Sequence, residues 1–424
     1  MITSGTVIIT IALVITTFVV PRKYFLLPYI LAACFVPADQ RILILGLDFT
    51  ILRILIAFGV LRMLARGEKR TTRWTRFDQL ILSWAVVGAS TYVIQWLDAR
   101  ALINRCGVLF DVIGLYWLFK QNIRSWADVQ FVFKVLAVCA VALLPFVTWE
   151  RATGQNPFSL IGRVGTEIRH AGFRCQATFP HSIMMGLFWA NLVPVFLGLT
   201  IAEGRKILYC SACAAAIFMV MASNSSTPIA ALIGVCLMLG LFSYRCYGRL
   251  MAYGSCAAAA ALHVVMNNSI WHLICRVNLI SGSTGWHRYK LIDGAIRHFN
   301  EWAFLGTRST TNWGWGLQDL TNQYVLEAVR GGLVTLILFV ILLITAVKTV
   351  GKYSMRPIPA KQQWFTWSLC VAMLGHCISF MGVSYFGQIV MLLYLMYAIV
   401  GFIYEISNKP ITNEQTWAAT PVPA

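Results

Sequence analysis

Between Asn267 and Gln323 the sequence has its only long polar stretch, and that stretch is basic and aromatic. Its acids are only Asp293, Glu301 and Asp319, and five tryptophans are interleaved. Its basic side chains are Arg276, Arg288, Lys290, Arg297, Arg308, His272, His287 and His298. Arginines neutralise concentrated negative charge through bidentate contacts, and tryptophans suit sugar rings at a membrane surface. The stretch therefore predicts a surface that binds an anionic, sugar-bearing lipid.

Helical spacing sorts these side chains further. If residues 286–301 form one helix, positions three and four apart share a face. That face predicts one polar stripe made of His287, Lys290, Gly294, Arg297, His298 and Glu301. Arg288 would lie about 100° from the centre of the stripe. We predict substrate-binding roles for Arg288, Lys290, Arg297, His287 and His298. The alternatives are solvated loop residues or, for Arg288, a contact with a lipid headgroup.

Three residues at the end of this stretch are candidates for the catalytic step. Asp319 is the first candidate for a proton acceptor, and its alternative role is to cap the helix that Asn322 begins. Asn322 is either catalytic or the N-cap itself. Glu327 lies near the start of the next apolar segment, where an unpaired carboxylate is costly and suggests a function. The alternative for Glu327 is a salt bridge with Arg330 at i+3.

A second polar loop, residues 150–181, carries further candidates. Arg169 and Arg174 are predicted to contact the donor or a headgroup, although cations beside a membrane often bind only phospholipid. His181 follows Pro180 at the start of a predicted helix, where it either binds substrate or caps the helix.

The composition identifies the elements that must position these residues. Of 424 residues, 58% are hydrophobic and only 12% are charged, which excludes an ordinary soluble domain. Apolar runs long enough to cross a membrane as helices recur along the chain. They cover residues 5–20, 24–37, 49–65, 77–97, 103–119, 129–149, 182–202, 207–222, 228–243, 250–266, 329–347, 363–381 and 387–405. The sequence predicts an all-α polytopic membrane protein with about 12–13 transmembrane helices, and with two external loops of which the larger is partly helical.

Lysines and arginines gather in short loops on one side of these spans, which predicts that this side is cytoplasmic. The loops at 150–181 and 267–322 then lie outside. Residues 1–406 are predicted to form a single transmembrane domain, and residues 407–424 a disordered cytoplasmic tail. The net charge of +18 follows from this topology and does not indicate a nucleic-acid partner.

Of the twelve cysteines, only Cys175 and Cys275 fall in the two external loops. They could pair in an oxidising compartment or remain free thiols. No CxxC or His/Cys spacing indicates a metal site, so we predict neither a metal nor a cofactor.

Four segments in residues 150–345 have a recognisable order and spacing. They are Arg174 through Pro180-His181, Ser225-Ser226-Thr227-Pro228, Arg288 followed by Ala303-Phe304-Leu305-Gly306, and Thr321-Asn322 followed after nine residues by Gly331-Gly332. This arrangement resembles the O-antigen ligase and O-antigen polymerase family of bacterial envelope glycosyltransferases. Two positions depart from the family pattern. Thr321 stands where the family has a histidine, and the segment 225–228 lacks the family's arginine.

The resemblance implies a metal-independent glycosyltransferase of the GT-C type in the bacterial inner membrane. It would transfer a glycan from undecaprenyl diphosphate at the periplasmic face, either polymerising repeats or ligating them to lipid A core. Its partners would be the undecaprenyl-diphosphate-linked oligosaccharide, a glycan or lipid acceptor, and membrane lipids. The alternatives are a flippase of lipid-linked glycans and a non-catalytic family member in an assembly complex. A flippase would place charges within several spans, and the small number of such charges in the sequence favours the transferase.

Overall fold

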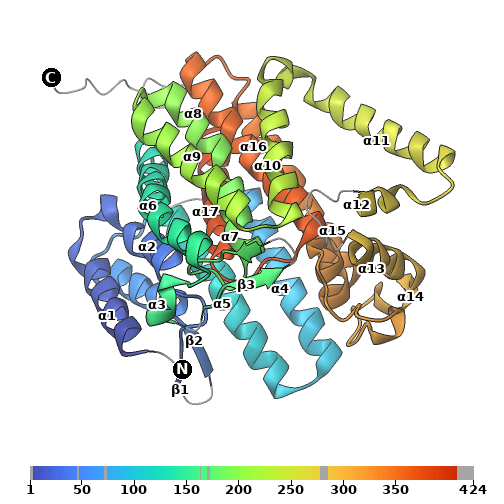
Figure 1. The fold of residues 1–424 in the computed structure, drawn as a ribbon, viewed down its shortest axis with the longest axis horizontal. Helices are drawn as coiled ribbons and strands as arrows, with labels where there is room; N and C mark the ends of the chain where they lie inside the picture. Colours follow the sequence, from blue (N-terminus) through green and yellow to red (C-terminus); the bar gives the residue numbers. More distant parts are fainter. Residues whose placement is uncertain are drawn as a thin grey trace.

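The computed structural model of the chain describes residues 3–44, 47–70, 74–162, 164–169, 172–276 and 285–407. These residues form a bundle of α-helices with two short antiparallel β-hairpins (Figure 1). The predicted all-α fold is therefore confirmed. The predicted tail starts at Ser407, and the rest of it lies outside the described residues.

The α-helices are α1 (Ser4–Val19), α2 (Leu27–Phe35), α3 (Ile51–Ala65), α4 (Arg76–Trp96), α5 (Ala99–Asn122), α6 (Trp126–Thr153), α7 (Ser182–Ala190), α8 (Val193–Glu203), α9 (Lys206–Ala222), α10 (Ser226–Gly240), α11 (Gly248–Val265), α12 (Leu273–Arg276), α13 (Gly285–Arg297), α14 (Phe299–Trp302), α15 (Gln323–Tyr353), α16 (Ala360–Gly382) and α17 (Ile389–Ser407). The 3-10 helices are η1 (Arg22–Tyr24), η2 (Pro157–Leu160), η3 (Leu241–Tyr247), η4 (Ile270–His272) and η5 (Thr311–Trp313). Strand β1 (Arg41–Ile44) pairs with β2 (Leu47–Thr50), and β3 (Glu167–Arg169) pairs with β4 (Gly172–Arg174).

Within the described residues, eight helical segments are long and apolar enough to cross a membrane. They are Arg76–Trp96, Ala99–Asn122, Trp126–Thr153, Ser182–Glu203, Ser226–Val265, Gln323–Tyr353, Ala360–Gly382 and Ile389–Ser407. This confirms a multi-pass membrane protein, although the number of full-length spans is smaller than the 12–13 predicted. The apolar helices α1 and α9 are shorter, at 16 and 17 residues. Helix α2 has nine residues and rises only about 14 Å, about half of a hydrocarbon core.

Helices α7, α8, α16 and α17 form the centre of the bundle. About four-fifths of the residues in their membrane-length windows are buried, against less than half in the other candidate spans. Figure 1 shows α1, α2 and α3 on one side of this centre and α13, α14 and α15 on the other. Helix α11 contributes no buried residue and extends away from the bundle.

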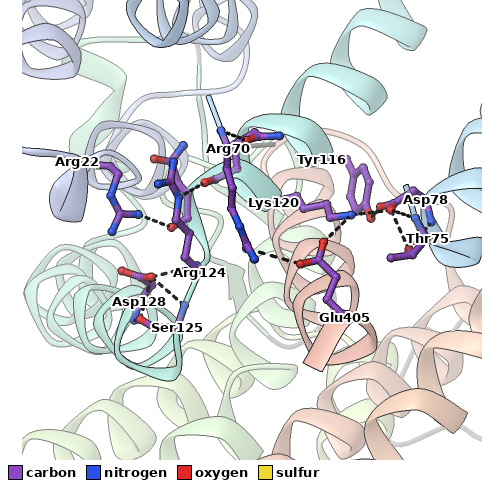
Figure 2. Close-up of polar contacts among 12 residues, drawn as sticks. Arg22, Arg70, Thr75, Asp78, Tyr116, Lys120, Arg124, Ser125, Asp128 and Glu405 are labelled. Carbon is purple, nitrogen blue, oxygen red and sulfur yellow. Dashed lines mark hydrogen bonds and ion pairs between the residues drawn. The ribbon is translucent and has the colours of Figure 1, made fainter. Parts of the chain in front are cut away.

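One end of the bundle is held by an ion cluster formed by Arg70, Asp78, Lys120 and Glu405 (Figure 2). The Lys120 ammonium lies 2.5 Å from a carboxylate oxygen of Asp78 and 3.0 Å from one of Glu405. Asp78 also accepts hydrogen bonds from Thr75 in a capping box that starts α4. Because Asp78, Lys120 and Glu405 come from α4, α5 and α17, the cluster fixes three helix ends together, and Arg70 adds the connection between α3 and α4. The sequence predicts this end to be cytoplasmic.

Candidate functional site

Residues 285–322 fold into a compact cap over the start of α15. Leu291 and Ala295 of α13 pack with Trp302, Trp313 and Leu317 in a small core. This core continues onto the first turns of α15 through Val325, Ala328 and Val329. The prediction that the larger polar loop, residues 267–322, is partly helical is therefore confirmed. The tryptophans that suit sugar rings by residue type differ in exposure, because Trp302 and Trp313 are buried in this core while Trp315 is fully exposed.

The cap is locked to α15 by two glycines in conformations that other residues rarely adopt. Gly306 has φ +83°, and Gly332, with φ +71° and ψ −173°, breaks α15. Across this break Leu333 N donates to Ala303 O at 2.9 Å, and Thr307 N donates to Val329 O at 2.8 Å. A Cβ on Gly306 would overlap Val329 O, and one on Gly332 would overlap Phe304 O. The two glycine motifs noted in the sequence therefore form one interlock, which we call the glycine interlock.

Three of the motif segments meet at the end of α16. Arg288 Nε donates to Gly382 O at 2.9 Å, and Asn322 Nδ2 donates to Met381 O at 3.1 Å. The Thr227 methyl group lies 2.6 Å from the position that a Cβ on Gly382 would take. We call Thr227, Arg288, Asn322 and Met381–Gly382 the α16-end cluster. Segments about 95 residues apart in the chain (227 to 322) thus converge on one helix terminus.

The α16-end cluster combines a fixed cation with a polar group that lacks a partner. Arg288 is only 8% exposed, so its positive charge is held in place before any ligand arrives. The hydroxyl oxygen of Thr227 is buried and has no hydrogen-bond partner among the described residues, and the same holds for Thr321, which precedes Asn322 in the chain but is outside the cluster as defined. Buried polar groups are normally satisfied, so orphaned ones call for an explanation such as an absent ligand or water. This arrangement can accept a polar, negatively charged group.

The predicted single helix over residues 286–301 is wrong, and with it the predicted polar stripe. Helix α13 ends at Arg297 and α14 begins at Phe299, so Glu301 does not continue the face of α13. The buried face of α13 consists of Gly285, Arg288, Leu291, Gly294 and Ala295. Lys290 and Arg297 are exposed, and Arg297 Nε pairs with Asp293 at 2.8 Å. Most of the stripe therefore faces away from the core, while Arg288 points inward.

The two histidines of the stripe make local contacts. His287 Nε2 lies 3.0 Å from the backbone oxygen of Asp319, and His298 Nδ1 lies 2.7 Å from a carboxylate oxygen of Glu301. Hydrogen bonds from Trp313, Asn312 and His298 lower the pKa of Glu301 to about 2. These contacts hold the cap together.

Asp319, the first candidate for a proton acceptor, is exposed on the cap. Asn322 is the N-cap of α15, because its Oδ1 accepts from Val325 N at 3.1 Å. It therefore has the structural role offered as its alternative, while its amide also belongs to the α16-end cluster.

The candidates of the second polar loop have structural contacts as well. His181 is the N-cap of α7, and its Nδ1 accepts from Ile183 N at 3.1 Å. Arg174 is 2% exposed and pairs with Glu167 at 2.6 Å across the β3–β4 hairpin. The side chain of Arg169 lies outside the described residues.

Cys175 and Cys275 are both free thiols. Cys175 is buried, and its backbone N donates to Ala222 O, whereas Cys275 Sγ contacts Gly285 O at 3.7 Å. Burial raises the pKa of Cys175 to about 12. The two alternatives were a disulfide between these cysteines and two free thiols, and the structure has the free thiols.

A charged cavity of about 360 Å³ adjoins the α16-end cluster. It lies between α4, α5, α15, α17 and the end of α16 with the segment that follows, and its polar lining includes Arg105, Asp111, Gln323, Glu327, Arg330 and Tyr385. Glu327 accepts from Gln323 Nε2 at 2.7 Å and from Trp84 Nε1 at 3.0 Å. Among the described residues Glu327 forms no ion pair, so the salt bridge with Arg330 that was its alternative role is absent.

The first turn of α15 connects the cavity to the α16-end cluster. Asn322 contacts Met381, and the next residue, Gln323, accepts from Tyr385 N at 2.9 Å. Tyr385 lines the cavity only three residues beyond Gly382. The cluster and the cavity are therefore neighbouring parts of one polar region.

Sequence reasoning missed Arg105, Asp111 and Arg330. The sequence did contain an indication of two of them, because Arg105 and Asp111 lie inside a predicted span at 103–119, where charges are costly and usually functional. Asp111 is paired with Arg53 by a bidentate contact at 2.7–3.0 Å, whereas the described residues offer no carboxylate within ion-pair distance of Arg105 or Arg330.

No family model and no curated protein matches this chain.

Proposed function

We propose that the protein is a metal-independent glycosyltransferase that takes a glycan from a polyprenyl-diphosphate-linked oligosaccharide at the outer face of the bacterial inner membrane. The observation that carries this proposal is the convergence of three motif segments on the end of α16. These segments were singled out in the sequence by their resemblance to O-antigen ligases and polymerases. Their meeting in space is what a shared site requires.

Arg288 is the residue we assign to the leaving diphosphate. In the reaction, the acceptor hydroxyl oxygen forms a bond to the anomeric carbon, and the bond from that carbon to the diphosphate oxygen breaks. The diphosphate leaves with the electron pair, so negative charge grows on its oxygens. A buried arginine anchored to Gly382 O is a preorganised cation that stabilises this charge without reorganisation.

Glu327 is the residue we assign to the proton of the acceptor hydroxyl. Thr321, at the position of the family's histidine, cannot accept a proton near neutral pH. Asp319 is exposed on the cap, whereas Glu327 faces the cavity beside the α16-end cluster. Both oxygens of Glu327 accept hydrogen bonds, one from Gln323 and one from Trp84, and these bonds hold the carboxyl group in place at the cavity.

The test is transfer by the purified protein in nanodiscs, with undecaprenyl-diphosphate-linked oligosaccharide and a chelator present. We expect a ladder of lipid-linked multimers, resolved by mass, that is lost in Arg288→Ala. Arg297→Ala is the matched control, because Arg297 lies on the same helix but faces outward. Product only after addition of lipid A core would identify a ligase. Equal activity in Arg288→Ala and wild type would refute the assignment of Arg288.

A flippase of lipid-linked glycans is the second candidate, and one observation favours it. Arg105, Asp111, Glu327 and Arg330 place charge within helical spans around a cavity. Such charges are expected along a transport path. A protein without transfer activity that moves the labelled lipid across liposome membranes would be this flippase.

A further inference from the structure

We infer that the charged cavity is a separate binding site for the phosphate group of a lipid, with Arg105 and Arg330 as its phosphate ligands. Under the proposed function, on which this role rests, the lipid is the acceptor, and Arg288 serves the donor. The binding itself is measurable without any transfer.

The first support is the charge of the cavity. Arg105 and Arg330 are close enough to interact electrostatically with each other and with Glu327. Asp111 is already neutralised by Arg53. The cavity therefore has one positive charge in excess, and two like charges lie in its lining, where they repel each other. A phosphate between the two guanidinium groups would remove their repulsion and accept bidentate hydrogen bonds from each.

The second support is how Arg105 is held. Its guanidinium carbon lies 3.6 Å from the centroid of the Tyr92 ring, a close cation–π contact. Its Nε is buried and has no hydrogen-bond partner among the described residues. Tyr92 thus orients Arg105 and leaves its Nε without a partner among the described residues, as expected for an arginine that binds an external anion.

The third support is the polarity of the walls, which indicates a lipid rather than a soluble anion. Beyond the charged groups the cavity is lined by apolar and aromatic side chains, among them Val108, Leu109, Phe339, Phe380 and Leu393. Arg330 is exposed, so the charged part of the cavity is accessible. A phosphate head on the arginines with an apolar chain along these walls matches both parts of the lining.

Glu327 connects this lipid-binding site to the proposed transfer reaction. It lies in the same cavity as the two arginines, held by Gln323 and Trp84. A lipid whose phosphate is fixed by Arg105 and Arg330 would bring its first sugar close to Glu327. The carboxylate would then receive the proton of the attacking hydroxyl, while the donor diphosphate leaves toward Arg288.

The experiment measures equilibrium binding of farnesyl diphosphate to the full-length protein in detergent micelles. Wild type, Arg105→Gln, Arg330→Gln and Arg288→Gln are compared with Arg308→Gln as control. Arg308 is an exposed arginine that bonds Gln95 O outside the cavity lining. We expect two binding sites in wild type and in the control. The affinity of one site should fall about tenfold or more in Arg105→Gln and in Arg330→Gln, because each substitution removes a hydrogen bond from a charged donor. The other should weaken in Arg288→Gln.

Further arms identify the source of the phosphate. Phosphatidylglycerol competing as well as farnesyl diphosphate for the cavity site would overturn the acceptor role, because any phospholipid would then occupy the cavity. Inorganic diphosphate competing equally would overturn the lipid requirement. Arg105→Lys keeps the charge but not the planar fork, so it should bind with intermediate affinity even if Arg105→Gln fails to fold.

Unchanged binding in both Arg105→Gln and Arg330→Gln would overturn the inference. This outcome is distinct from failure of the proposed function, which would appear as no glycan transfer by a wild type that still binds the lipid at the cavity.

Discussion

The glycine interlock offers the sharpest test of how the cap is held over the site. We predict that Gly332→Ala strongly destabilises the protein and removes transfer activity. Gly332 has a positive φ with extended ψ, a region that is essentially restricted to glycine. Its added methyl group would also overlap Phe304 O. The cap, which carries Arg288, would have to move away from α15.

The magnitude follows from two contributions. Placing alanine in this backbone region costs about 1–3 kcal/mol. Moving the cap breaks the hydrogen bonds Leu333 N to Ala303 O and Thr307 N to Val329 O, each worth about 1 kcal/mol. We therefore expect Gly332→Ala to lower the free energy of unfolding by about 3–5 kcal/mol. Gly316 is the matched control, because it has φ +78° and no atom within 4 Å of an added Cβ. Gly316→Ala should cost only about 1–2 kcal/mol.

The assay is reversible unfolding in mixed detergent and SDS micelles, followed by tryptophan fluorescence, with glycan transfer measured in parallel. Gly306→Ala should behave like Gly332→Ala, because its Cβ would overlap Val329 O across the same contact. The double variant should lose clearly less than the sum of the single losses, since either substitution alone opens the interlock. Equal losses for Gly332→Ala and Gly316→Ala would refute this reasoning, because they would show that backbone conformation alone sets the cost.

Three further predictions concern the cap and the second polar loop. Arg288→Lys should retain binding of the donor lipid but reduce the transfer rate about tenfold or more, because lysine lacks the planar guanidinium that makes bidentate contacts. A transfer rate equal to that of the wild type would show that the positive charge alone suffices. Hydrogen bonds, first of all the one from Trp313, lower the pKa of Glu301 in the folded protein. The ionised carboxylate therefore stabilises the cap at pH values above the ordinary carboxyl pKa, and this stabilisation should be lost as the pH falls toward about 2. Trp313 fluorescence should report that transition in wild type, and the same transition in Glu301→Gln would contradict the assignment. Cys175 and Cys275 should remain unpaired after oxidation, with Cys175 resistant to maleimide in the folded protein, as mass spectrometry of labelled peptides would show.

The class of fold was predictable because the apolar runs exceed what any soluble domain contains. The number of full spans was not, because hydropathy does not show where a helix ends. The run predicted at 24–37 contains only the nine residues of α2, after the η1 turn that follows Pro21. The runs at 228–243 and 250–266 belong to one candidate span that is interrupted by η3. Such breaks are caused by local turns and tertiary packing, so the composition of an apolar run does not reveal where its helix is interrupted.

The residues of the candidate site could be predicted from the sequence where they belong to motifs with a defined spacing. Arg288 and Asn322 were singled out in the sequence, and both contact the end of α16. The polar stripe was wrong because its periodicity assumed an unbroken helix through His298. Arg105 and Arg330 were missed because they are 225 positions apart, and only the packing of α5 and α15 against α4 and α17 brings them to one cavity.

The distribution of ion pairs bears on the choice between a transferase and a flippase. A transport path must offer accessible polar groups at successive depths of the membrane. Helix α5 has charges at Arg100, Arg105, Asp111 and Lys120, and only the two arginines lack an acidic partner among the described residues. Asp111 is paired with Arg53, and Lys120 is held between Asp78 and Glu405 in the ion cluster at the other end of α5 (Figure 2). Transport along α5 would have to break these pairs in turn, and separating buried pairs is costly. A transferase needs only the two arginines of the cavity, Arg105 and Arg330, and neither has an acidic partner among the described residues.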